Sequence, residues 1–176
     1  MELVIKSPMI PTIFRQRIFF NGQKKGYLAA IHRFGSLKGD QSFKVNFNDQ
    51  IVSLVENKRK NRDRNWSILV GNNDVSKNRG SVTMTSRVAD TLQDHFTQYD
   101  IEFQKTDYLL ECSFMTFSGK KEAFLLNHHK EEIANLVFTY FKMPLFRKVI
   151  NIHNLKQYTD DEIAFIIVVL NTVIFL

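Results

Sequence analysis

The chain has 176 residues, of which 44% are apolar, 24% charged and 12% aromatic. This composition excludes a disordered or low-complexity protein, because such chains contain fewer apolar residues and more Gly and Pro than the 7 and 3 found here. The single cysteine, Cys112, excludes an internal disulfide and a zinc site built from several cysteines. The length predicts one domain over residues 1–176.

Charge is divided unevenly along the chain. The net charge is +6, yet residues 1–90 carry 16 Lys and Arg against 7 Asp and Glu, whereas residues 91–176 carry 8 against 11. A basic surface attracts polyanions, because phosphates that contact it release their condensed counterions. The same charge on a solvated surface only maintains solubility. A basic half over 1–90 and an acidic half over 91–176 therefore indicate a polyanion-binding face.

Short runs rich in Ile, Phe and Val predict strands in the first two thirds of the chain. The clearest is Ser42–Phe47, in which polar and apolar residues alternate. Turn signals such as Asn21-Gly22 separate further predicted strands at residues 12–20, 26–32, 51–55, 66–70, 101–105, 107–117 and 122–126. These runs predict a mainly antiparallel, twisted sheet.

Three segments predict helices. The first is capped by Ser86 and has an apolar stripe that ends at Tyr99. The second begins near Asn127 and carries an apolar stripe of Ile133, Leu136, Val137, Tyr140 and Phe141. The third begins with the capping box Thr159-Asp160-Asp161-Glu162, although the β-branched residues after it leave a buried hairpin open. The expected fold is α+β, with two or three helices packed on one face of the sheet.

The C-terminal residues 163–176 are apolar except for Asn171 and Thr172. A membrane-spanning helix needs about 20 residues, so no membrane partner is expected. An element without a polar face must be wrapped by the sheet or covered by a second copy, and we predict a homo-oligomer formed through this segment. No secretory signal is visible near Lys6 and Pro8, which together with the single cysteine predicts a cytoplasmic or other intracellular, non-secreted protein.

The densest charge cluster lies at residues 58–64, with five cations in seven residues. Flexible Lys and forked Arg side chains suit phosphate contacts. The candidate nucleic-acid contacts are Lys58, Arg59, Lys60, Arg62 and Arg64, with Lys24 and Lys25 of another predicted turn in support. The neighbouring Trp66 either stacks on a base or lies in the core, and the composition of buried sites favours the core.

The triplet Glu56-Asn57-Lys58 follows an apolar run and resembles the Glu-x-Lys half of a PD-(D/E)xK nuclease site. The resemblance implies catalytic roles for Asp49, Glu56 and Lys58, with Mg²⁺ held between the two carboxylates. No Pro precedes Asp49, and a separation of seven positions is short for two adjacent strands. A metal-dependent nuclease is therefore kept as an alternative function.

A second acidic group, Asp100, Glu102, Asp107 and Glu111, lies on a predicted hairpin. Asp100 and Glu102 share one strand face, where they form either a Mg²⁺ site or a solvated surface. The chain contains no HExxH zinc motif and no glycine-rich nucleotide motif.

Together these patterns predict a non-catalytic nucleic-acid-binding protein without a metal or cofactor, with DNA and RNA both open. Its expected setting is regulation, a virus or a mobile element. A protein-interaction module, such as an inhibitor or assembly subunit whose basic loop is incidental, is the other alternative to the nuclease.

Overall fold

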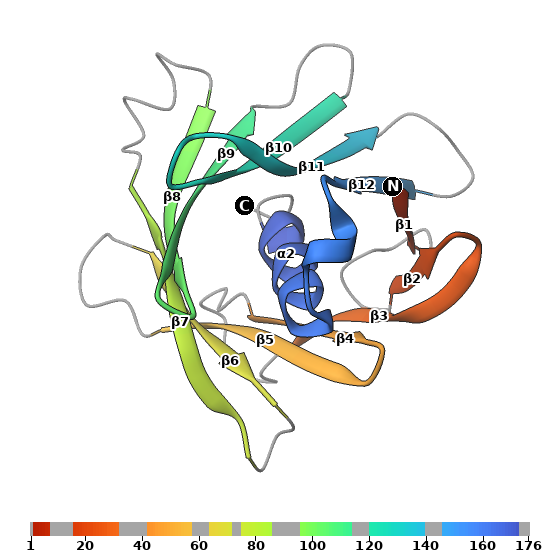
Figure 1. Cartoon of the computed structure of the whole chain (residues 1–176), viewed down its shortest axis with the longest axis horizontal. Helices are drawn as coiled ribbons and strands as arrows, with labels where there is room; N and C mark the ends of the chain where they lie inside the picture. The colour runs from red at the N-terminus through yellow and green to blue at the C-terminus, as the bar shows by residue number, and fades with distance from the viewer. Residues whose placement is uncertain are drawn as a thin grey trace.

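The computed structural model describes residues 2–7, 16–31, 42–57, 64–71, 75–85, 96–113, 120–139 and 146–172. In these ranges twelve strands form a closed antiparallel barrel in which each strand pairs with its neighbours in sequence, and β1 pairs with β12 (Figure 1). The strands are β1 (Glu2–Ser7), β2 (Gln16–Phe20), β3 (Gln23–Ile31), β4 (Ser42–Phe47), β5 (Gln50–Glu56), β6 (Asn65–Val70), β7 (Lys77–Met84), β8 (Phe96–Phe103), β9 (Thr106–Ser113), β10 (Lys120–Asn127), β11 (Glu132–Thr139) and β12 (Phe146–Ile152). A 3-10 turn, η1 (Leu155–Gln157), and helix α2 (Asp160–Thr172) follow.

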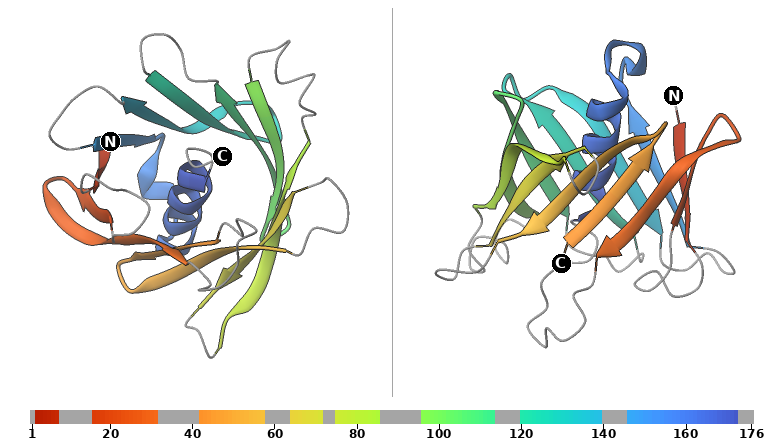
Figure 2. Two further views of the ribbon diagram at one scale, coloured as in Figure 1. Left: turned by 180° about the vertical axis from the view of Figure 1, so that it is seen from behind. Right: turned by 90° about the horizontal axis from the view of Figure 1, so that it is seen from below.

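The expected α+β fold is wrong, because the sheet closes on itself and the only α-helix in the described ranges lies inside it (Figures 1 and 2). Every residue of α2 from Ile163 to Asn171 is buried. A helix that is apolar on all sides cannot cover one face of an open sheet without exposing its other side. A closed barrel buries all sides at once, which is the physical reason for this architecture.

The helix begins as the sequence predicts. The Thr159 amide donates to Glu162 Oε2 at 2.7 Å, and the Glu162 amide donates to Thr159 Oγ1 at 3.4 Å, which is the reciprocal capping box. The hairpin alternative is therefore wrong for residues 160–172. Further along the helix, the Phe165 ring stacks on Phe103 of β8 with centroids 4.1 Å apart.

The position of α2 also bears on the self-association expected through the C-terminal segment. From Ile163 to Leu170 the apolar side chains are covered by strands of the same chain, so this described part offers no surface to a second copy and lends no support to self-association. Residues 173–176 of the predicted segment lie outside the described residues. Within the described ranges, no helix combines the length and apolarity needed to cross a membrane.

Neither of the other two predicted helices is observed where the structure describes their residues. The stripe of Ile133, Leu136 and Val137 belongs to strand β11, which carries apolar residues on both faces and pairs with β10 across a register shift at Leu125 and Leu126. Because apolar residues lie on both faces of β11, their spacing along the sequence resembles the three- and four-residue spacing of an apolar helix face. The helix predicted from Ser86 ends in strand β8, and residues 86–95 lie outside the described residues.

Strict alternation builds the wall of the barrel. In β4, Phe43, Val45 and Phe47 are buried in the lumen, while the residues between them are half-buried on the outside, as the sequence predicts. The same alternation in the other strands lines the lumen with side chains such as Ile5, Leu54 and Ile150, which are fully buried. The described part of the lumen is therefore a packed core around α2.

Consecutive hairpins alternate between the two ends of the barrel. One end, the short-turn end, has two-residue turns at Asn21–Gly22, Asn48–Asp49 and Gln104–Lys105, all with positive φ. Two positive φ angles define the hairpin turn whose twist matches the strands, and the Asn21-Gly22 prediction is confirmed. The end of β5 and the start of β6, like the end of β11 and the start of β12, lie at the opposite end of the barrel, which we call the far end.

Two glycines occupy equivalent close contacts in the wall. A Cβ on Gly26 of β3 would overlap the Asn46 carbonyl oxygen, and a Cβ on Gly80 of β7 would overlap that of Glu102. Each glycine lies beside a register shift with the preceding strand. The strands approach too closely there for any side chain, so both positions require glycine on steric grounds.

We expect Gly80→Ala to destabilise the barrel by about 1–3 kcal/mol, because the added methyl group must displace backbone. Urea unfolding followed by circular dichroism measures the change. The matched control is Ser81→Ala at the next, exposed position of β7, which should change the free energy of unfolding by less than about 0.5 kcal/mol. Equal effects of the two substitutions would contradict the steric explanation.

Candidate functional site

The basic run is only partly described. Residues 58–63, which include Lys58, Arg59, Lys60 and Arg62, lie outside the described residues. Arg64 is described, and its Nε donates to Glu56 Oε1 at 3.1 Å. Its guanidinium carbon also lies 5.1 Å from the Trp66 ring centroid, within cation–π range. Arg64 is thus engaged within the barrel, and the prediction that Trp66 belongs to the core is confirmed by its complete burial.

Lys24 and Lys25 lie at the other end of the barrel from Arg64, the described cation of that run. They follow the Asn21–Gly22 turn at the short-turn end, whereas the strand ends that flank residues 58–63 lie at the far end. Among the described residues, the structure therefore does not bring Lys24 and Lys25 together with Arg64.

The residues of the nuclease alternative are also separated. Asp49 lies in the turn before β5, and Glu56 is the last residue of that strand, so their backbones are about 20 Å apart at 3.3 Å per residue. Two ligands of one Mg²⁺ must each approach it to about 2 Å. The Glu56 side chain is fully buried and paired with Arg64. The structure does not supply the paired carboxylates that this alternative requires.

A different set of cations shares one outer surface. We define the cationic wall as the outer face of β2, β3 and β4, with Arg17, Lys24, Lys25 and Lys44. Arg17 and Lys24 are exposed, while Lys25 and Lys44 are half-buried. These three strands contain no Asp or Glu. Any carboxylate that pairs with the cations of this wall therefore comes from another part of the chain.

Strand pairing places the backbones of two further basic residues in register with Arg17. The backbone of Lys6 in β1 pairs with that of Arg17 on one side and with that of Arg147 of β12 on the other. Sequence reasoning missed Arg17 and Lys44 because it searched for local clusters. A broader signal was present, since residues 3–39 contain seven Lys and Arg and no acid.

The opposite wall of the barrel is acidic. Asp100, Glu102 and Asp107 are exposed on β8 and β9, and Glu102 pairs directly with Asp107. The prediction that Asp100 and Glu102 share a face is confirmed. β8 is six strands from β2 around the barrel, so the acidic and cationic walls face away from each other (Figure 1).

A groove of about 670 Å³ adjoins the acidic wall. Its lining combines both signs of charge: Asn78, Arg79, Gly80, Ser81, Glu102, Gln104 and Lys105. Within the described ranges, no three His, Cys, Asp or Glu side chains come together as a metal site.

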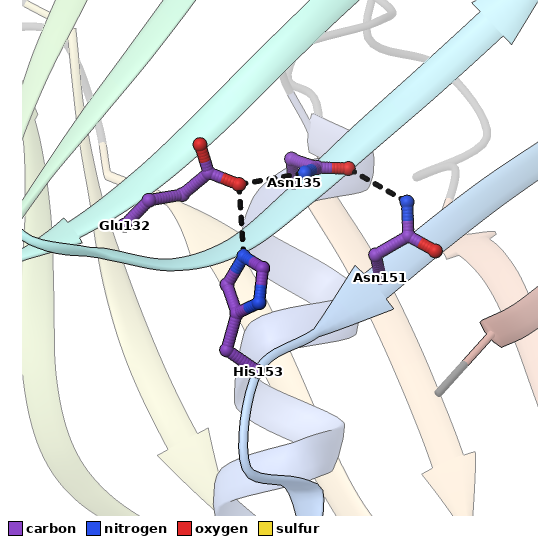
Figure 3. A network of polar contacts seen from close by, with 4 residues as sticks. All are labelled: Glu132, Asn135, Asn151 and His153. Carbon is purple, nitrogen blue, oxygen red and sulfur yellow. Dashed lines mark hydrogen bonds and ion pairs between the residues drawn. The ribbon is translucent and has the colours of Figure 1, made fainter.

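A polar network on the outside of β11 and β12 ties the strands to the turn that leads to η1 (Figure 3). His153 Nε2 lies 3.0 Å from Glu132 Oε1, which also accepts from Asn135 Nδ2 at 2.6 Å, and Asn151 Nδ2 donates to Asn135 Oδ1 at 2.9 Å. Burial alone would raise the pKa of Glu132, but the hydrogen bonds with His153 and Asn135 hold it below its ordinary value. These side-chain contacts thus link β11 to β12 and to the turn that follows β12.

A second polar cluster lies inside the lumen and fastens α2 to the wall. Lys148 Nζ of β12 donates to Gln16 Oε1 of β2 at 3.2 Å and to Asn171 Oδ1 of α2 at 3.0 Å. Asn171 Nδ2 donates in turn to the Ile167 carbonyl oxygen at 2.8 Å. Gln16, Lys148 and Asn171 are all buried, and we call them the lumen cluster. Burial lowers the pKa of Lys148 to about 7.

Comparison of the chain with protein-family models, with curated proteins and with solved structures gave no match. The comparisons thus lend no support to the viral origin or the self-association expected from the sequence, and function has to be argued from geometry.

We expect the stability of the protein to rise with pH between about 7 and 10.5 through Lys148. In this window the unfolded chain keeps the lysine protonated, while the folded chain releases the proton. Because the unfolded state binds more protons, raising the pH disfavours it, and the free energy of unfolding increases. Lys148→Met should remove this rise. Urea unfolding at pH 7 and pH 9.5 measures the difference in unfolding free energy for each protein.

The matched control is Lys77→Met, which removes an exposed lysine on β7 and should keep the wild-type pH dependence. A rise of the same size in Lys148→Met as in the wild type would contradict the assignment of this pH dependence to Lys148.

Proposed function

We propose that this protein is a non-catalytic nucleic-acid-binding protein that contacts phosphates with the cationic wall. The observation that carries the proposal is the absence of any Asp or Glu in β2, β3 and β4, next to the cations Arg17, Lys24, Lys25 and Lys44 on their outer face. A surface that neutralises several phosphates gains free energy from counterion release, whatever the base sequence.

The acidic wall on the far side of the barrel supports this orientation. A molecule with opposite charge on its two sides is steered, so that a polyanion meets the cationic wall and is repelled by the other. The described part of the lumen is packed, which leaves the outer surface for binding a large partner. The proposal does not depend on the cations of residues 58–63, whose contribution remains a prediction from the sequence.

The proposal includes an intracellular location, where nucleic acid is present. Cys112 is a buried thiol that forms no disulfide, as is usual in reducing compartments.

The test is a titration of labelled 20-nucleotide DNA and RNA at 50, 100 and 200 mM salt, followed by fluorescence anisotropy. We expect the logarithm of the binding constant to fall linearly with the logarithm of salt concentration. The double variant Arg17→Gln, Lys24→Gln should bind more weakly, with a slope smaller by about 0.7 for each phosphate of a single strand that it no longer neutralises.

The control removes the same two residue types from another wall. Lys77→Gln with Arg79→Gln, both exposed on β7, should leave affinity and slope close to wild type. Circular dichroism confirms that all variants are folded. Absence of salt-dependent binding, or binding to anionic phospholipid vesicles in place of nucleic acid, would overturn the proposal.

A further inference from the structure

We propose that the cationic wall prefers single-stranded over duplex nucleic acid and stacks bases on Phe19 and Tyr27. The inference rests on the proposed function and adds the kind of nucleic acid that is bound. It starts from the two aromatic residues on the outer face of β2 and β3, which have no part in attracting phosphates by charge.

Strand register interleaves rings with cations on this face. Arg17 of β2 pairs with Tyr27 of β3, and Phe19 of β2 pairs with Lys24 of β3. Both rings are half-buried, and both cations are exposed. The Cβ atoms of directly opposite residues on an antiparallel pair lie about 5 Å apart, so each aromatic residue faces a basic residue on the neighbouring strand.

This pattern matches what a single strand offers. Every unpaired nucleotide presents a flat base face and a phosphate, and proteins that bind single strands combine aromatic platforms with a positively charged surface. Arg17 and Phe19 are two residues apart on β2, which corresponds to about 7 Å along the strand. The two ring–cation pairs thus provide stacking and phosphate contacts for two bases.

A duplex fits the same surface poorly. Its base faces are hidden in the stack, and its major groove, about 12 Å wide, admits an α-helix or a two-stranded ribbon. The wall of a twelve-stranded barrel is broad and convex (Figure 2). The only α-helix in the described ranges lies in the lumen and cannot enter a groove. A duplex therefore gains only the phosphate contacts.

The experiment compares single-stranded dT20 and rU20 with a 20-base-pair duplex and with heparin, a polyanion without bases. Wild type should bind the single strands more tightly than the duplex at the same salt concentration. Phe19→Leu with Tyr27→Leu should weaken single-strand binding by about 5- to 150-fold for each ring that stacks, while duplex and heparin affinities stay within twofold.

The matched control is Phe124→Leu, which removes a half-buried ring from the outer face of β10 and should leave every affinity unchanged. A direct readout of stacking comes from Phe19→Trp, whose fluorescence should be quenched by dT20 and unaffected by heparin. The native Trp66 is fully buried and gives a constant background.

The outcomes separate the two proposals. Salt-dependent binding with equal affinity for single strand and duplex, or single-strand binding that survives removal of both rings, overturns this inference and leaves the proposed function standing. No binding to any of these polyanions overturns both.

Discussion

The architecture depends on one constraint: a helix without a polar face has to be enclosed. The segment from Ile163 to Asn171 is buried on every side, and its only polar side chain, Asn171, is used by Lys148. An open sheet with helices on one face would leave half of this helix in water. The sheet instead closes around it, which also removes the unpaired strand edges that an open sheet presents.

Buried polar groups fix the helix in this lumen at a cost in stability. Placing a lysine in a low-dielectric interior is unfavourable, and hydrogen bonds from Lys148 to Gln16 and Asn171 offset part of that cost. Purely apolar packing would allow the helix to slide or rotate, whereas the hydrogen bond from Lys148 to Asn171 at 3.0 Å favours one register. The ion pair of Glu56 and Arg64 similarly joins β5 to the chain entering β6.

The chain order of the strands converts a charge difference along the sequence into a charge difference in space. Because each strand pairs with its sequence neighbours, β1 to β7 come from the basic half and β8 to β12 from the acidic half. Arg17 and Asp100 therefore face opposite directions, and the molecule carries a positive and a negative wall. Local clusters behave differently, since successive loops alternate between the barrel ends and separate Lys24 from Arg64.

Local features followed directly from the amino-acid pattern: alternation placed Phe43 and Val45 inside, Asn21-Gly22 formed a hairpin turn, and the Thr159–Glu162 box started the helix. Closure of the sheet, the strand conformation of Ile133 and Leu136, and the pairing of Glu56 with Arg64 emerged only from the folded chain. Periodicity reports which face of an element is apolar, but not what covers it. The cationic wall likewise depends on cross-strand register, which joins residues that no local window contains.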